Sequence, residues 1–216
     1  MAEVGRLWHI GRLGIHEEHA VTAVTHRVLG LLAASATQVP RIMALSLLGQ
    51  YDEAIACAER AKHEFVALGD RRAAAKVSLN LGAMFVHRGD YAEAVRQSRQ
   101  AAVLFARVGD HEWSITADMN MANALTSLGD FDEALRGFAR AEMRAAAHAF
   151  PVLQALIEEA VAFLRLARGQ YGEALSGFEG ARRRYEQLDM VQEAAVAEKQ
   201  LADTYLELRL LPEALA

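Results

Sequence analysis

One short motif occurs five times in this 216-residue chain, and its copies stand at a constant spacing. The first copy reads Gly-Gln-Tyr-Asp-Glu-Ala, and the copies begin at Gly49, Gly89, Gly129, Gly169 and Arg209. A fixed period of this length is typical of proteins that are built from stacked pairs of helices. Each pair has an apolar face that only the next pair can cover. The sequence therefore predicts an all-α protein, an α-solenoid of antiparallel helix pairs.

Each motif has the residues that are expected at an elbow between two helices. Gly89 and Gly129 stand where a first helix must end, because glycine adopts the left-handed backbone conformation without a side-chain clash. Asp90 and Asp130 follow at the N-cap position of a second helix, and each has a glutamate three residues later. This spacing is a close variant of the capping box, so both aspartates are predicted to cap the helix that they begin.

Two columns of alanine follow the motif within each second helix. The two columns are seven residues apart, so they lie on one face at a spacing of two turns. Small residues at this spacing allow close approach of a partner helix, and Phe138 and Phe178 between them are predicted to fill the remaining groove. The columns are Ala54, Ala94, Ala134, Ala174 and Ala214, then Ala61, Ala101, Ala141 and Ala181.

Composition restricts the class of protein. Hydrophobic residues make up 53% of the chain but aromatic residues only 7%, which favours closely packed helices over a sheet. The net charge of −5 argues against nucleic-acid contact, and the basic run 182–184 is interpreted as a solvated helix face. Cys57 is the only cysteine and is expected to be a small buried hydrophobe. We expect a cytoplasmic protein without a disulfide, a secretory signal or a membrane span.

The repeat resembles a known family. Tyr-x-x-Ala, followed seven residues later by Ala and preceded by Leu81-Gly82 and Phe85, resembles the tetratricopeptide repeat. The resemblance covers residues 37–216, about four and a half repeats of about 40 residues each, whereas the usual period is about 34. It implies that the α-solenoid is right-handed. It also implies a non-catalytic scaffold that binds a protein or a peptide, within a bacterial regulatory or signalling protein.

In tetratricopeptide arrays the first helix of each repeat lines a concave surface that holds an extended peptide. Asn80 and Asn120 occupy equivalent positions one repeat apart, and their amides can pair with a peptide backbone through both donor and acceptor atoms. Ordinary solvated helix residues are the alternative interpretation. By register, the surface includes Lys76, Asn80, His87, Thr116, Asn120, Asn123, Glu159, Phe163, Lys199 and Asp203.

Residues 1–36 do not follow the repeat and form a separate N-terminal helical segment in this interpretation. Trp8, nine intervening residues and then Glu18-His19 resemble the second half of the helical cap of cobalamin-binding regulators. That resemblance implies a second candidate function, a fragment or remnant of a cobalamin-responsive sensor in which these three residues border the cofactor. His16, His19 and His26 are spaced to share one helix face. Such a face could hold a metal ion, and the alternative interpretation is a polar face with ordinary histidines.

No enzyme motif is recognised in the chain. The sequence has no phosphate-binding glycine loop, no metal-binding cysteine cluster and no nucleophile elbow, and helix capping explains the recurring glutamates. We therefore predict a protein that is not an enzyme and needs no cofactor. A third candidate function is self-assembly, in which exposed solenoid ends pair two chains into a homo-oligomer. The fifth repeat stops at Ala216, a few residues into its second helix, which favours a piece of a longer polypeptide.

Overall fold

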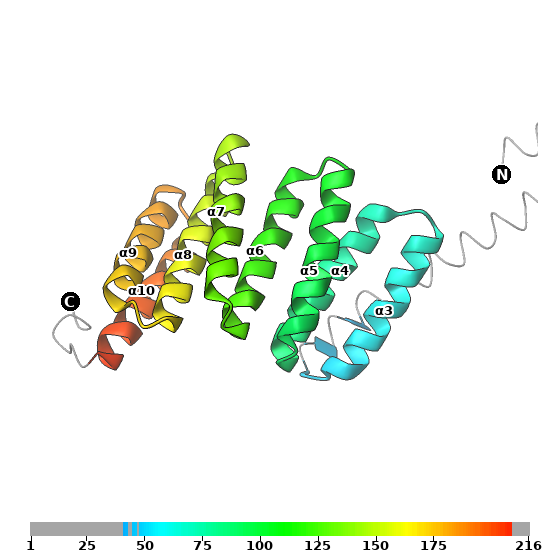
Figure 1. Ribbon diagram of the computed structural model, residues 1–216, viewed down its shortest axis with the longest axis horizontal. Helices are drawn as coiled ribbons and strands as arrows, with labels where there is room; N and C mark the ends of the chain where they lie inside the picture. The colour runs from blue at the N-terminus through cyan, green and yellow to red at the C-terminus, as the bar shows by residue number, and fades with distance from the viewer. Residues whose placement is uncertain (1–40, 43–44, 47, 209–216) are drawn as a thin grey trace, which may run out of the picture. The chain divides into compact units, whose positions relative to one another are not determined.

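The computed structural model describes residues 41–42, 45–46 and 48–208, and the described chain from Tyr51 onward is almost entirely α-helical. No strand occurs in these described ranges, as the sequence predicts for an all-α protein. The helices, labelled in Figure 1, are α3 (Tyr51–Ala67), α4 (Arg71–Arg88), α5 (Tyr91–Arg107), α6 (His111–Leu128), α7 (Phe131–Ala147), α8 (Pro151–Ala167), α9 (Tyr171–Gln187) and α10 (Val191–Glu207).

The chain divides into two compact units, residues 1–77 and residues 78–216. In the first unit, Ala54, Cys57, Ala58 and Ala61 of α3 are buried, which confirms the predicted role of the cysteine. In the second unit, the helices from α5 to α10 each pack against the next one in the chain, and α6 also contacts α8 (Figure 1). This packing order is the predicted array of helix pairs, in which α6 and α8 are first helices and α7 and α9 are second helices. The boundary predicted after residue 36 lies outside the described residues.

The elbows have the predicted backbone conformation. Gly129 follows α6 with φ of 83°, in the left-handed region, and its N–H donates to the carbonyl of Thr126 at 3.0 Å. The N–H of Asp130 donates back to Leu125 at 3.0 Å, so the final carbonyls of the helix have partners. The Asp130 carboxylate then accepts from the backbone N–H of Glu133 at 3.3 Å and caps α7, which confirms that prediction.

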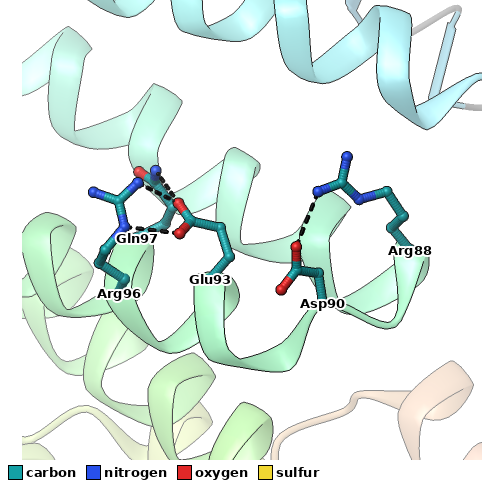
Figure 2. A network of polar contacts seen from close by, with 5 residues as sticks. All are labelled: Arg88, Asp90, Glu93, Arg96 and Gln97. Atoms are coloured by element: carbon teal, nitrogen blue, oxygen red, sulfur yellow. Dashed lines mark hydrogen bonds and ion pairs between the residues drawn. The ribbon is translucent and has the colours of Figure 1, made fainter.

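The capping prediction is wrong at Asp90. Its side chain forms no capping bond to α5 and instead accepts from Arg88 Nη2 at 3.0 Å (Figure 2). Glu93 likewise turns along the helix surface, where it accepts from Arg96 Nε at 2.8 Å and from Gln97 Nε2 at 2.9 Å. Neighbouring cations and amide donors therefore compete with the backbone for these carboxylates, and the sequence spacing alone does not decide the outcome.

Among the described residues, two turns between successive repeats lack the glycine that the other turns use. Ala149 and Asp189 have φ values of 54° and 56°, the left-handed region that Gly69 and Gly109 occupy at the corresponding positions of earlier repeats. The chain turns in the same way because the carbonyls of the preceding helix still receive their bonds; the N–H of Phe150 donates to Ala145 at 2.9 Å. A Cβ atom in this conformation carries a steric cost.

We expect Ala149→Gly to raise the free energy of unfolding by about 1 kcal/mol, because the left-handed conformation then has no Cβ clash. Urea denaturation followed by circular dichroism would measure the change. The matched reverse variant is Gly109→Ala, where an added Cβ meets nothing within 4 Å and only the backbone angle, φ of 72°, opposes it. Equal stability of the native protein and Ala149→Gly would show that Ala149 is unstrained.

The alanine columns form the seams between helices, as predicted. Every described member of the two columns is fully buried, and Phe138 and Phe178 are buried between them. In the second unit, Phe138 packs in one core cluster with Ile115, Leu125 and Leu164, which come from α6 and α8. Each second helix therefore shares its core with first helices on both sides, as expected for a solenoid.

The closest approach within a helix pair is marked by glycine. A Cβ atom built on Gly177 of α9 would lie 2.8 Å from the Cβ of Ala162 of α8. The equivalent distance from Gly137 of α7 to Ala122 of α6 is 3.1 Å. Real Cβ atoms do not approach to less than 3.0 Å, so Gly177 is required by its neighbour and not by a turn.

Candidate peptide-binding surface

The predicted surface residues of α6 and α8 lie on exposed or partly exposed positions. We call the set Thr116, Asn120, Asn123, Leu156, Glu159, Phe163 and Val196 the first-helix face; it spans α6, α8 and α10 of the second unit. On α8 the spacing from Leu156 to Glu159 and Phe163 is three and then four residues, which places the three side chains on one side of the helix. Because α6 and α8 are in contact, their parts of this face are neighbours.

The asparagine amides of this face have no hydrogen-bond partner among the described residues. Asn120 is partly exposed and Asn123 is exposed. Asn80 on α4 is also exposed, and its amide likewise has no partner among the described residues. Thr116 differs, because its hydroxyl donates to the carbonyl of Glu112 at 3.0 Å within its own helix. Each free amide offers one acceptor and two donor hydrogens. These groups can pair with a peptide backbone without breaking a bond of the folded chain.

The predicted charged residues of the face are arranged differently. Lys199 donates to Asp203 at 2.6 Å, one turn along α10, so this pair neutralises itself. His87 is exposed near the end of α4. Lys76 is also exposed, and it belongs to the first compact unit whereas the other predicted residues belong to the second.

Phe163 is the exposed aromatic of the face. The side chain keeps 39% of its surface exposed, and its ring meets the buried ring of Phe178 edge-on, with centroids 4.9 Å apart and planes at 80°. This geometry is favourable for an aromatic pair and fixes the orientation of Phe163 from below. Partly exposed Leu156 on the same helix and Val196 on α10, which is 49% exposed, add aliphatic surface. Both occupy the repeat position of Thr116, and neither was predicted from the sequence.

Glu159 has an unusual environment in this face. Its Oε2 atom accepts a hydrogen bond of 2.7 Å from the hydroxyl of Tyr185, a side chain of α9 with no exposed surface. Burial raises the pKa of the Glu159 carboxyl; the Tyr185 hydrogen bond opposes this, and nearby Glu193 adds to it. Burial, followed by the bond to Glu159, also raises the pKa of Tyr185, so the phenol remains protonated and donates. The Glu159–Tyr185 contact was not predicted from the sequence.

One ion pair between a first and a second helix recurs at equivalent positions of two successive repeats. Asp118 of α6 pairs with Nη1 of Arg144 of α7, and Nη2 of the same guanidinium donates to the Ser114 hydroxyl at 2.9 Å. The equivalent pair one repeat later joins Glu158 Oε2 to Arg184 Nε at 2.7 Å. Burial raises the pKa of Asp118, although the charge of Arg144 opposes that shift. These pairs hold the helices in register. Their charged groups already have partners within the chain.

Other sequence predictions fall outside this surface. Trp8, Glu18 and His19, like the remaining histidines of the N-terminal segment, lie outside the described residues. The basic run 182–184 is spread over a helix, and each arginine forms an ion pair with a glutamate, as expected for a solvated face. Within residues 48–208 no group of three metal-ligating side chains comes together. None of the described helices is long and apolar enough to cross a membrane.

The comparisons with known proteins agree with the fold. Residues 71–142 match the family model of the tetratricopeptide repeat. No curated protein matches the sequence significantly. Among solved structures, BtubC from P. vanneervenii is similar with a TM-score of 0.65 at 15% identity, over 91% of this chain and 86% of that chain.

Two further solved structures are also similar. Aspartyl phosphate phosphatase F from Bacillus subtilis has a TM-score of 0.77 at 16% identity, over 96% of this chain and 56% of that chain. The Rap conjugation gene regulator of plasmid pLS20, solved in complex with the Phr* peptide, has a TM-score of 0.76 at 16% identity, over 86% of this chain and 52% of that chain. This chain thus spans about half the length of these two proteins. It carries tetratricopeptide repeats over residues 71–142, and its described helices have the tetratricopeptide-repeat fold.

Proposed function

We propose that this chain is a non-catalytic scaffold that binds an extended peptide or protein segment along the first-helix face, within a bacterial regulatory system. The observation that carries the proposal is that amides without a hydrogen-bond partner lie on one first helix and exposed apolar side chains lie on the next. Asn120 and Asn123 offer hydrogen-bonding groups that the fold leaves unused, and Leu156 and Phe163 on the adjacent first helix offer apolar contact. No chemical step is needed for this activity.

The mechanism is complementarity on a preformed surface. The asparagine amides receive main-chain N–H and C=O groups of an extended segment, whatever its sequence, and each bond contributes on the order of 1 kcal/mol. Phe163 is already held by the Phe178 ring, so little side-chain entropy is lost when a ligand covers it. Amides therefore provide general affinity, and the apolar part provides selectivity.

The similar structures support the regulatory setting. One of them is a gene regulator in complex with a peptide, and its tetratricopeptide-like fold covers most of this chain. Likeness at 16% identity is a likeness of fold, so the partner of this chain is proposed from its own residues. The free asparagine amides of α6 are the groups that the proposal tests first.

We expect the double variant Asn120→Ala, Asn123→Ala to bind peptides about tenfold or more weakly, because two hydrogen bonds to the ligand backbone are lost. Binders would first be selected from a random heptapeptide phage library on the immobilised native chain. Fluorescence anisotropy with the synthesised peptides then gives Kd, and circular dichroism checks that helicity is unchanged.

The control is Gln187→Ala, which removes an exposed amide at the end of α9, on a second helix and outside the face. That variant should bind as the native chain does. Unchanged affinity in the double asparagine variant would remove the asparagines from the proposed surface.

A further inference from the structure

The α8 part of the first-helix face differs in chemistry from the α6 part. At the positions of Thr116, Asn120 and Asn123 of α6, the next repeat has Leu156, Ala160 and Phe163. The first helix thus changes from amide and hydroxyl groups to aliphatic and aromatic ones within one repeat. A ligand lying across both helices meets hydrogen-bonding groups on one side and apolar surface on the other.

One carboxylate interrupts the apolar part. Glu159 lies three residues after Leu156 and four before Phe163, so the carboxylate stands between two apolar side chains on the same side of α8. It is partly buried, and the Tyr185 hydroxyl holds it at 2.7 Å. Because Tyr185 is completely buried, it has no freedom to release the carboxylate by moving into solvent. The Tyr185 hydrogen bond therefore orients the Glu159 carboxylate before any ligand arrives.

This carboxylate has no counter-charge. Among the described residues Glu159 forms no ion pair, and the ionisable group of α10 that acts on it is Glu193, a like charge. Lys199, the cation on α10 that the sequence placed in this surface, is bound to Asp203. Partly buried carboxylates are normally paired, and a cation placed beside one is attracted more strongly than at a fully exposed site.

The helical repeat does not require this polar pair. At the equivalent positions of the preceding repeat the chain has Met119 and Ala145, both of which pack with the apolar core of their repeat. The same fold therefore accepts apolar side chains at both positions. Glu159 and Tyr185 place a partly buried polar contact where an apolar one is sufficient, so folding alone does not explain them.

We propose that the α8 part of the face receives a peptide segment in which a lysine or arginine adjoins an apolar side chain, with the cation on the Glu159 carboxylate and the apolar group on Leu156 and Phe163. The inference rests on the proposed peptide-binding function and adds the partner's chemistry to it. Charge complementarity selects this occupant, because Glu159 and Glu193 would repel an acidic segment. Tyr185 is a positioning residue that acts through Glu159.

The test uses the same heptapeptide library on the full chain. We expect selected peptides to contain lysine or arginine next to a large apolar residue more often than the unselected library does. For the tightest selected peptide, replacing its basic residue by norleucine should weaken binding to the native chain about tenfold, as expected for loss of a charge-assisted contact. The same replacement should change the affinity for Glu159→Gln by less than about twofold, because that variant has no charge to lose.

Glu159→Gln keeps an oxygen that accepts from Tyr185, and a thermal melt followed by circular dichroism checks that the variant is folded. Glu142→Gln is the matched control, because it removes one exposed carboxylate from the second helix α7. It should retain the full difference between the basic peptide and its norleucine form. Selected peptides without basic residues, or an equal difference in Glu159→Gln, would overturn this inference while peptide binding stands. Selection of no peptide at all would overturn the proposed function and the inference together.

Discussion

Gly177→Val is expected to lower the free energy of unfolding by about 2–3 kcal/mol, the largest effect of any single substitution considered for this chain. The Cβ that valine adds would lie 2.8 Å from the Cβ of Ala162, and that atom is fixed to the backbone of α8. Both residues are fully or nearly fully buried, so the helices α8 and α9 must move apart. The higher helix propensity of valine offsets only a few tenths of this cost.

Urea denaturation of the native chain and of the variant would measure the loss. Gly172→Ala is the matched control in the same helix, because a Cβ there meets nothing within 4 Å. That control should be as stable as the native protein or slightly more stable, since alanine favours helix over glycine. Equal stability of Gly177→Val and the native chain would show that the two helices are not in close contact at this point.

A compensating pair tests the same contact from both sides. Gly177→Ala alone should destabilise the chain, and adding Ala162→Gly should restore most of the loss, because one methyl group is then moved from α8 to α9. The chain already contains an arrangement of this kind. One repeat before Ala122 and Gly137, the glycine is on the first helix, as Gly82, and the larger residue is on the second helix, as Gln97. A double variant that is as unstable as the sum of the single variants would contradict the direct contact.

Arg144→Met is expected to lower the free energy of unfolding by about 1–2 kcal/mol at pH 7. The substitution leaves the partly buried Asp118 carboxylate without its cation, and removes a donor from Ser114. Breaking a fully buried ion pair costs about 3–5 kcal/mol, but this pair keeps 34% and 24% of its side-chain surface exposed, so we expect less. The double variant Asp118→Leu, Arg144→Met should come within about 1 kcal/mol of the native chain, because neither charge remains.

The loss in Arg144→Met should depend on pH. Burial already raises the pKa of Asp118 in the folded chain, and removing the positive charge of Arg144 raises it further. A raised carboxyl pKa means that the folded state prefers the protonated form, so the cost of ionisation is present above the folded pKa and fades as pH falls through it. Denaturation at pH 7 and again at mildly acidic pH should therefore show a smaller difference from the native chain at the lower pH. An identical loss at both values would attribute the effect to packing of the arginine stem.

The periodic part of this fold follows from the sequence because its determinants are local. Gly129 needs only its own backbone angle to end α6, and the alanine columns need only their spacing to lie at the helix seams. Asp90 shows where local reasoning ends. Its spacing to Glu93 is that of a cap, but the outcome depends on Arg88 and Arg96 as competing donors, and side-chain competition is not encoded in a spacing.

The candidate surface could be predicted only in part for a similar reason. Helix register identifies which side of a first helix is open, and this placed Asn120, Asn123 and Phe163 at accessible positions. Register does not reveal that Tyr185, on the second helix, reaches through the core to Glu159. Leu156 and Val196 were not predicted, because the sequence does not distinguish an apolar side chain that packs in the core from one that lies exposed.

The order in which the helices pack also has a consequence for how such a chain can evolve. Since each of α5 to α10 touches mainly the next one, the insertion or removal of one whole repeat at an elbow would leave most seams with an equivalent partner. The reach of the molecule along a ligand can then lengthen or shorten in steps of one repeat. The chemistry at each step can change separately, as the replacement of Met119 and Ala145 by Glu159 and Tyr185 illustrates. The length of the binding surface and its selectivity for a ligand can thus change independently of each other in this architecture.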